Sequence, residues 1–233
     1  MSLCPRCGVP IYNDEPCPVC GQELRSPYAP RIFRDGTLSY LESAFRLSLI
    51  LPRVYTPILI GGIFRGLLEL LALNLGYTST LNRPSLIGSL LFLLGSFWVY
   101  LLSFSTIKIS SEAYGNKVIS PRNSVTYIQN NIGDFLVASI LATFFGFNIV
   151  MIPIALLMVV IMVQDEKNAT LSLRKISNIQ EMRDDFIKIS ILPILGSIIV
   201  GSIPVMGGII QSILLGYTSF AYLCVYLKTE TIT

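Results

Sequence analysis

The sequence predicts an all-α polytopic membrane protein with a small β-type zinc ribbon at its N-terminus. Of the 233 residues, 52% are hydrophobic and 13% are charged, whereas an average soluble domain carries about 25% charged residues. Long uncharged segments recur after residue 55, and four of the five cysteines lie within the first 20 residues. This composition excludes an ordinary soluble enzyme, a disordered tail and a fibrous repeat.

The cysteine spacing near the N-terminus predicts a metal site. Cys4, Cys7, Cys17 and Cys20 form C-x2-C-x9-C-x2-C, and each pair lies in a Cys-Pro-x-Cys-Gly knuckle. Four thiolates close a tetrahedral zinc site that has no position for water, so the ion would be structural. The pattern resembles the short zinc-ribbon family, which implies one Zn²⁺ per chain. The alternatives are two disulfides, or an iron site of the rubredoxin kind.

The predicted domains are a zinc ribbon over 1–24, a basic linker over 25–36 and a membrane domain over 37–233. A membrane-spanning helix needs about 20 apolar residues. Six spans are expected, at about 56–75, 86–107, 135–147, 149–163, 187–205 and 207–227. The uncharged segment 135–163 is too long for one span and short for two. We interpret it as two short helices with a turn at Phe147–Asn148; the alternative is a re-entrant segment.

The positions of the positive charges predict the topology. With six spans, 15 of the 17 Lys and Arg residues fall on one side of the membrane, and cytoplasmic loops carry the excess of such residues. Both termini and the zinc ribbon are therefore expected in the cytoplasm of a multi-pass cell-membrane protein.

Each pair of spans follows an amphipathic segment that is expected to form an interfacial helix, at about 37–50, 120–132 and 169–183. The first has Leu38, Leu41, Phe45 and Leu49 on one helical face. The sequence thus predicts three helix-plus-hairpin units. The alternative is coincidence, because cytoplasmic loops of membrane proteins are often amphipathic.

Three segments carry a resemblance to a known group: ESAFRLSLILP, the loop Ala113-Tyr114-Gly115-Asn116-Lys117, and VVIMVQDEKNATLSLRKI. Over about 38–228 the chain resembles a group of prokaryotic six-helix membrane domains. The group includes the membrane domain of some glycerophosphodiester phosphodiesterases. No phosphodiesterase domain is present, so the resemblance implies no such activity. The zinc ribbon and the Ile-rich composition suggest an archaeal member.

Arg65 and Glu69 are the candidate site residues of the membrane domain. They lie four residues apart within the first predicted span, where ionisable groups are rare and mark functional sites by default. One interpretation is a path for a polar substrate or protons, and the other is an internal ion pair. Small residues at Gly62 and Gly66, and at 208, 212 and 216, predict close helix packing, either within the chain or in a dimer. The carboxylate pairs at 165–166 and 184–185 are expected on solvated faces, and Cys224 in the core.

These features predict a non-enzymatic membrane protein. The chain has no His, which removes the commonest general base, and no motif pairs a nucleophile with a base. The first hypothesis is a scaffold or assembly subunit whose zinc ribbon docks a cytoplasmic partner. The alternative is a transporter or channel component that uses Arg65 and Glu69. Expected partners are the lipid bilayer, a protein bound through the ribbon and a second copy of the chain, but no nucleic acid.

Overall fold

The computed structural model describes residues 2–3, 10–11, 36–75, 86–114, 121–165, 168–178, 183–200, 203 and 206–232. Within these ranges the chain forms nine α-helices, and two short strands, β1 (Ser2–Leu3) and β2 (Pro10–Ile11), pair antiparallel. The four cysteines of the expected zinc site, Cys4, Cys7, Cys17 and Cys20, lie outside the described residues. The zinc ribbon therefore stays a prediction.

Six apolar helices form at the places where the sequence predicts spans. They are α2 (Thr56–Asn74), α3 (Leu86–Tyr114), α5 (Ile132–Phe147), α6 (Ile152–Asp165), α8 (Arg183–Val200) and α9 (Met206–Ile232). Short 3-10 helices precede α2 and α6, at Pro52–Tyr55 and Ile149–Met151. The predicted turn between α5 and α6 is confirmed, because α5 ends at Phe147 and the Asn148 side chain accepts a hydrogen bond from the Val150 amide at 3.2 Å.

Fewer of these helices are span candidates than the six that were predicted. By length and composition, Pro52–Asn74, Ile87–Ala113 and Met206–Leu227 could cross a membrane. With 16 and 14 residues, α5 and α6 extend only about 24 and 21 Å at 1.5 Å per residue, less than the hydrocarbon core of about 30 Å. Helix α8 is excluded because its 18 residues include four charged ones, Arg183, Asp184, Asp185 and Lys188.

A fourth candidate exists if α6 and α7 (Ala169–Asn178) count as one span bent by 113°. The described part of the chain thus contains three to four span candidates. All six predicted helices are present, but only the first, second and sixth predicted spans are long and apolar enough by themselves.

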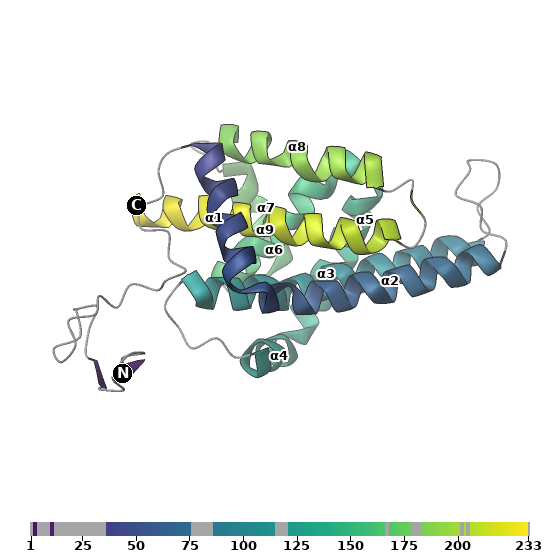
Figure 1. Ribbon diagram of the computed structural model, residues 1–233, viewed down its shortest axis with the longest axis horizontal. Helices are drawn as coiled ribbons and strands as arrows, with labels where there is room; N and C mark the ends of the chain where they lie inside the picture. The colour runs from purple at the N-terminus through teal and green to yellow at the C-terminus, as the bar shows by residue number, and fades with distance from the viewer. Residues whose placement is uncertain are drawn as a thin grey trace.

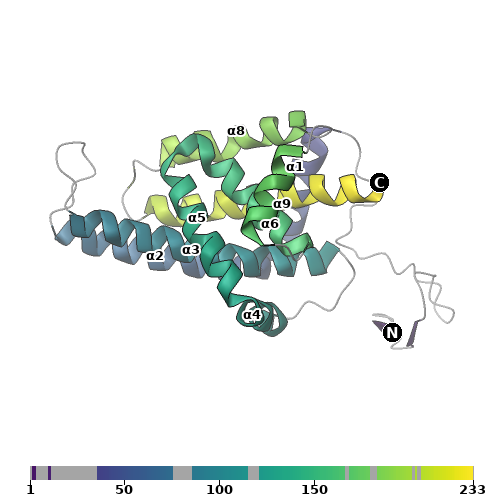
Figure 2. The same ribbon diagram turned by 180° about the vertical axis from the view of Figure 1, so that it is seen from behind.

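The predicted amphipathic segments also form helices: α1 (Thr37–Ile50), α4 (Pro121–Asn130) and α7. Each precedes a pair of apolar helices, so the order helix-then-hairpin occurs three times, as predicted. Helices α2, α3, α8 and α9 run along the long axis of the bundle, and α1 crosses them at a steep angle near the C-terminal end of α9 (Figures 1 and 2).

The core-facing side of α1 differs from the expected apolar face. Tyr40, Ala44 and Leu47 are buried in the core, whereas Leu38 and Phe45 of the predicted face are 83% and 54% exposed. Periodicity cannot separate the two sides, because an apolar helix face can meet either the protein core or lipid.

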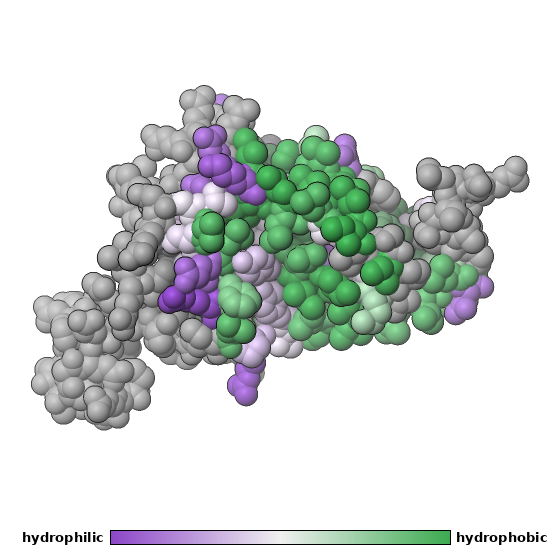
Figure 3. Space-filling model, turned by 45° about the horizontal axis from the view of Figure 1, so that its top comes forward, coloured by the Kyte–Doolittle hydropathy of each residue, from purple (hydrophilic) through white to green (hydrophobic). Residues whose placement is uncertain are grey.

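Helix α9 lies at the centre of the bundle and contacts α1, α2, α3, α6 and α8. It is also the most enclosed span candidate, with 72% of its most apolar stretch buried. The surface of the bundle is apolar as well: large side chains such as Ile63 and Leu67 on α2 and Ile198 on α8 are at least half exposed. Figure 3 shows a broad hydrophobic surface along the bundle, bordered by hydrophilic residues toward the α1 end. A surface of this kind suits contact with lipid.

Candidate functional site

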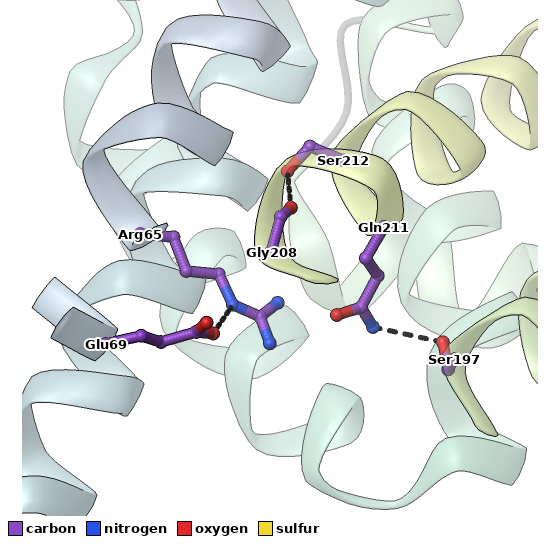
Figure 4. Close-up of polar contacts among 6 residues, drawn as sticks. All are labelled: Arg65, Glu69, Ser197, Gly208, Gln211 and Ser212. Carbon is purple, nitrogen blue, oxygen red and sulfur yellow. Dashed lines mark hydrogen bonds and ion pairs between the residues drawn. The ribbon is translucent and has the colours of Figure 1, made fainter. Parts of the chain in front are cut away.

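The structure brings Arg65 and Glu69 together as a buried ion pair on α2. The Arg65 Nε donates to Glu69 Oε1 at 2.8 Å, and the two side chains are only 9% and 16% exposed (Figure 4). Residues four apart lie on one face of a helix, so the predicted spacing is sufficient to form the pair. Arg65 lies near the middle of the span candidate Pro52–Asn74, and Glu69 lies closer to its C-terminal end.

Glycines on the neighbouring helices make room for the pair. A Cβ at Gly95 of α3 would lie 2.9 Å from the Arg65 Cγ, and one at Gly208 of α9 would lie 3.4 Å from Glu69 Oε2. The guanidinium also lies over the Phe92 ring, with 4.6 Å between Cζ and the ring centroid, a cation–π contact. The pair is therefore enclosed between α3 and α9.

The small residues singled out in the sequence form helix contacts within the chain. A Cβ at Gly62 would lie 2.6 Å from the Ser212 Oγ, and one at Gly216 would lie 2.9 Å from the Tyr55 ring. Gly66 is buried on the same helix. The predicted packing seam is thus confirmed as a close contact between α2 and α9.

A cavity of about 30 Å³ lies beside the guanidinium. Since a water molecule needs about 10–15 Å³ measured in this way, one or two water-sized particles fit. Four helices supply its walls: Arg65 from α2, Phe92, Ser96, Val99 and Tyr100 from α3, Thr143 and Gly146 from α5, and Gln211 and Leu215 from α9.

Some polar groups around the cavity already have partners. Gln211 Nε2 donates to the Ser197 Oγ at 3.0 Å, which leaves its Oε1 on the side of Arg65 (Figure 4). Thr143 Oγ1 donates to the Ser139 carbonyl at 2.7 Å. Among the described residues, no hydrogen-bond acceptor is found for the terminal nitrogens of Arg65 or for the Tyr100 hydroxyl, which is buried. The cavity therefore combines a cation with hydrogen-bond donors that lack an acceptor.

Sequence reasoning found Arg65 and Glu69 but missed the other members of this site. Tyr100 lies in an almost uninterrupted apolar helix, where its hydroxyl gave no signal. Gln211 was a weak signal, because it is the one amide side chain in α9. Only the packing of four helices shows that both side chains meet the guanidinium.

A second polar cluster lies where α6, α7 and α9 meet. Asp165 accepts hydrogen bonds from Lys175 Nζ and the Tyr226 hydroxyl, both at 2.7 Å, and its side chain is 6% exposed. The expectation of a solvated face at Asp165 is therefore wrong, because Lys175 of α7 and Tyr226 of α9 both contact the carboxylate. We call Asp165, Lys175 and Tyr226 the clamp.

Another polar contact joins the beginnings of α1 and α8. Thr37 Oγ1 donates to Asp185 Oδ1 at 2.6 Å, so Asp185 is also partly buried rather than on a solvated face. Burial and the Asp185 carboxylate, with a smaller contribution from Cys224, raise the pKa of Tyr40 on α1 above its ordinary value. Cys224 itself is buried in the core, as predicted.

The chain matches no protein-family model, no curated protein sequence and no solved structure. The two resemblances drawn from the sequence, to short zinc ribbons and to a prokaryotic six-helix membrane domain, therefore remain predictions. The description of the chain therefore depends on its own structure. It is an all-α protein with three to four span candidates and a buried, charged site.

Proposed function

We propose that the chain is a multi-pass membrane protein that acts as a transporter or channel component, with the Arg65–Glu69 cavity as its solute site. One observation carries this proposal: a buried guanidinium faces an internal cavity at mid-span, with its terminal nitrogens open to a ligand. A charged residue at the centre of a membrane helix costs about 2.5–3.5 kcal/mol on insertion scales. A pair that served only for cohesion would need no such cavity beside it.

Permeability of proteoliposomes tests this function. Vesicles that hold the purified chain and the potassium carrier valinomycin are shifted into potassium chloride, potassium nitrate or urea, and their swelling is followed by light scattering. The carrier lets potassium accompany any anion that crosses, so that salt and water can enter together. We expect swelling faster than in empty vesicles for at least one of these solutes, and a return to the empty-vesicle rate with Arg65→Gln. The matched control is Arg46→Gln, because Arg46 forms an i,i+4 pair with Glu42 at 2.6 Å on the exposed surface of α1. Equal rates for both variants would exclude Arg65 from the path.

A second candidate function is a scaffold or assembly subunit whose cytoplasmic zinc ribbon docks a protein partner. The paired knuckles of Cys4, Cys7, Cys17 and Cys20 favour it, since a closed four-thiolate site would hold one structural Zn²⁺. Partners that co-purify with the wild-type chain should be lost when Cys4 and Cys7 become Ser. Retention of every partner would count against docking through the ribbon. Both candidate functions are non-enzymatic, and they can coexist in one subunit.

For the topology we propose three hairpins that enter from one side, α2–α3, α5–α6 and α8–α9, with both termini in the cytoplasm. The polar contacts support a common side, because the clamp joins the C-terminal part of α6 to that of α9. The Thr37–Asp185 bond likewise joins the starts of α1 and α8. This topology is the same whether the short α5–α6 hairpin crosses the membrane fully or is re-entrant. It retains the six predicted helices but does not require six full-length spans.

A further inference from the structure

We infer that the cavity binds one small monovalent anion of about halide size on the terminal nitrogens of Arg65. This inference rests on the proposed function, since it names the solute class of the same site. Three properties of the cavity lead to it: its excess of hydrogen-bond donors, the position of its charges and its size.

The first property is the excess of donors. A guanidinium has five N–H donors and no acceptor, and only the Nε donor is used, by Glu69. The buried Tyr100 hydroxyl adds another donor with no acceptor among the described residues. These donors open into the cavity, so the occupant that satisfies them best is one that accepts several hydrogen bonds.

The second property is where the two charges lie. Glu69 binds the guanidinium at Nε and packs against Gly208, while the cavity lies on the side of Phe92 and Tyr100. An ion in the cavity would therefore be nearer to the positive charge than to the carboxylate. Because the Coulomb energy falls with distance, the attraction by Arg65 exceeds the repulsion by Glu69, although the pair as a whole is neutral.

The third property is size. About 30 Å³ accommodates one or two water-sized particles and leaves no room for a carboxylic acid or a phosphate ester. The wall beside Tyr100 is already tight, since a Cβ at Gly146 would lie 2.6 Å from the Tyr100 hydroxyl. Gln211 is compatible with an anion as well as with water in the cavity. Its amide can turn so that Nε2 faces the cavity while the Ser197 hydroxyl donates to Oε1.

Equilibrium binding of radiolabelled chloride to the full chain in nanodiscs tests the inference, with gluconate holding the ionic strength constant. We expect saturable binding of one chloride per chain and at least tenfold weaker binding with Arg65→Gln. Glu69→Gln should bind chloride about tenfold more tightly, because it removes the opposing charge while it keeps the side-chain shape. The exposed-pair variant Glu42→Gln is the matched control and should bind like the wild type.

The gain expected for Glu69→Gln keeps the test sharp, because a misfolded variant cannot bind more tightly. Absence of saturable chloride binding in the wild-type chain would overturn the inference and leave water as the occupant. Weaker binding by Glu69→Gln, or unchanged binding by Arg65→Gln, would also overturn it. The proposed function is tested independently of the anion site. Saturable chloride binding without vesicle swelling would contradict transport and support the anion site. Swelling in urea without chloride binding would support transport and contradict the anion site.

Discussion

The Arg65–Glu69 pair predicts an unusual pattern of mutant stabilities. Glu69→Leu leaves a guanidinium that is 9% exposed without its partner. Breaking a buried pair costs about 3–5 kcal/mol, and Coulomb's law gives a similar figure of about 4 kcal/mol for charges ~4 Å apart at an effective dielectric constant of 20. For a chain of this size, about 2–4 °C of melting temperature per kcal/mol converts this loss into a decrease of roughly 10 °C.

Replacing both residues should restore most of that loss. In Arg65→Leu with Glu69→Leu no charge is left unpaired, and the leucine at 65 keeps the Cβ and Cγ atoms that pack against Gly95. We therefore expect the double variant to unfold at a higher temperature than either single variant. The assay is thermal unfolding in detergent of the wild type, both single variants and the double variant, which together form a double-mutant cycle.

The exposed pair on α1 supplies the control for this cycle. Arg46 and Glu42 have the same spacing, but their side chains are 72% and 58% exposed, and pairs of this kind are worth about 0.3–0.5 kcal/mol. Glu42→Leu should therefore hardly change the melting temperature. If the double Leu variant at 65 and 69 is no more stable than Glu69→Leu alone, the two charges do not compensate each other, and the reasoning is refuted.

Three further predictions concern the ribbon, the topology and the helix seam. Metal analysis of the purified chain under reducing, chelator-free conditions should find one zinc per chain. The Cys17→Ser variant should lose this zinc, while its membrane domain keeps its melting temperature. Zinc near zero in the wild type would contradict the ribbon. A cysteine introduced at Ser79, which lies outside the described residues, should be labelled from outside intact cells. A cysteine introduced at Thr170, which is exposed on α7, should not be labelled. Labelling at Thr170 would contradict the three-hairpin topology. Gly62→Ala should lower the melting temperature, because its Cβ would lie 2.6 Å from the Ser212 Oγ. Gly133→Ala should not, because open space surrounds Gly133. Equal effects of the two variants would mean that α2 and α9 pack less closely than the structure shows.

Helix positions could be predicted from this sequence, because uncharged segments and their polar breaks mark the helices directly. Asn148 ended α5 as expected, and the spacing of Arg65 and Glu69 was enough to predict their pair. The number of spans could not be predicted equally well, since α5 and α6 are apolar throughout but short. Apolar character shows that a segment avoids water, and it does not show whether the segment crosses the bilayer.

Which side of each helix faces the protein could not be predicted for a related reason. In a soluble protein the apolar face is the buried face, but here both faces of α1 carry apolar residues, and the structure buries Tyr40 while it exposes Leu38. The same ambiguity hid the cavity beside Arg65, because Tyr100 and Gln211 line it together with Arg65 only through the packing of helices that are distant in sequence.

The chain's single tryptophan offers the most direct test that the Arg65 cavity lies inside a bilayer. Trp98 of α3 is 37% exposed, contacts Phe64 of α2 and directly precedes two cavity residues, Val99 and Tyr100. Its fluorescence is measured in vesicles whose lipids carry bromine either deep in the acyl chains or near the headgroups. We expect the deep bromines to quench it most strongly and aqueous acrylamide to quench it little. Strongest quenching by acrylamide or by the headgroup bromines would place α2 and α3 outside the hydrocarbon core and contradict a solute site within the membrane.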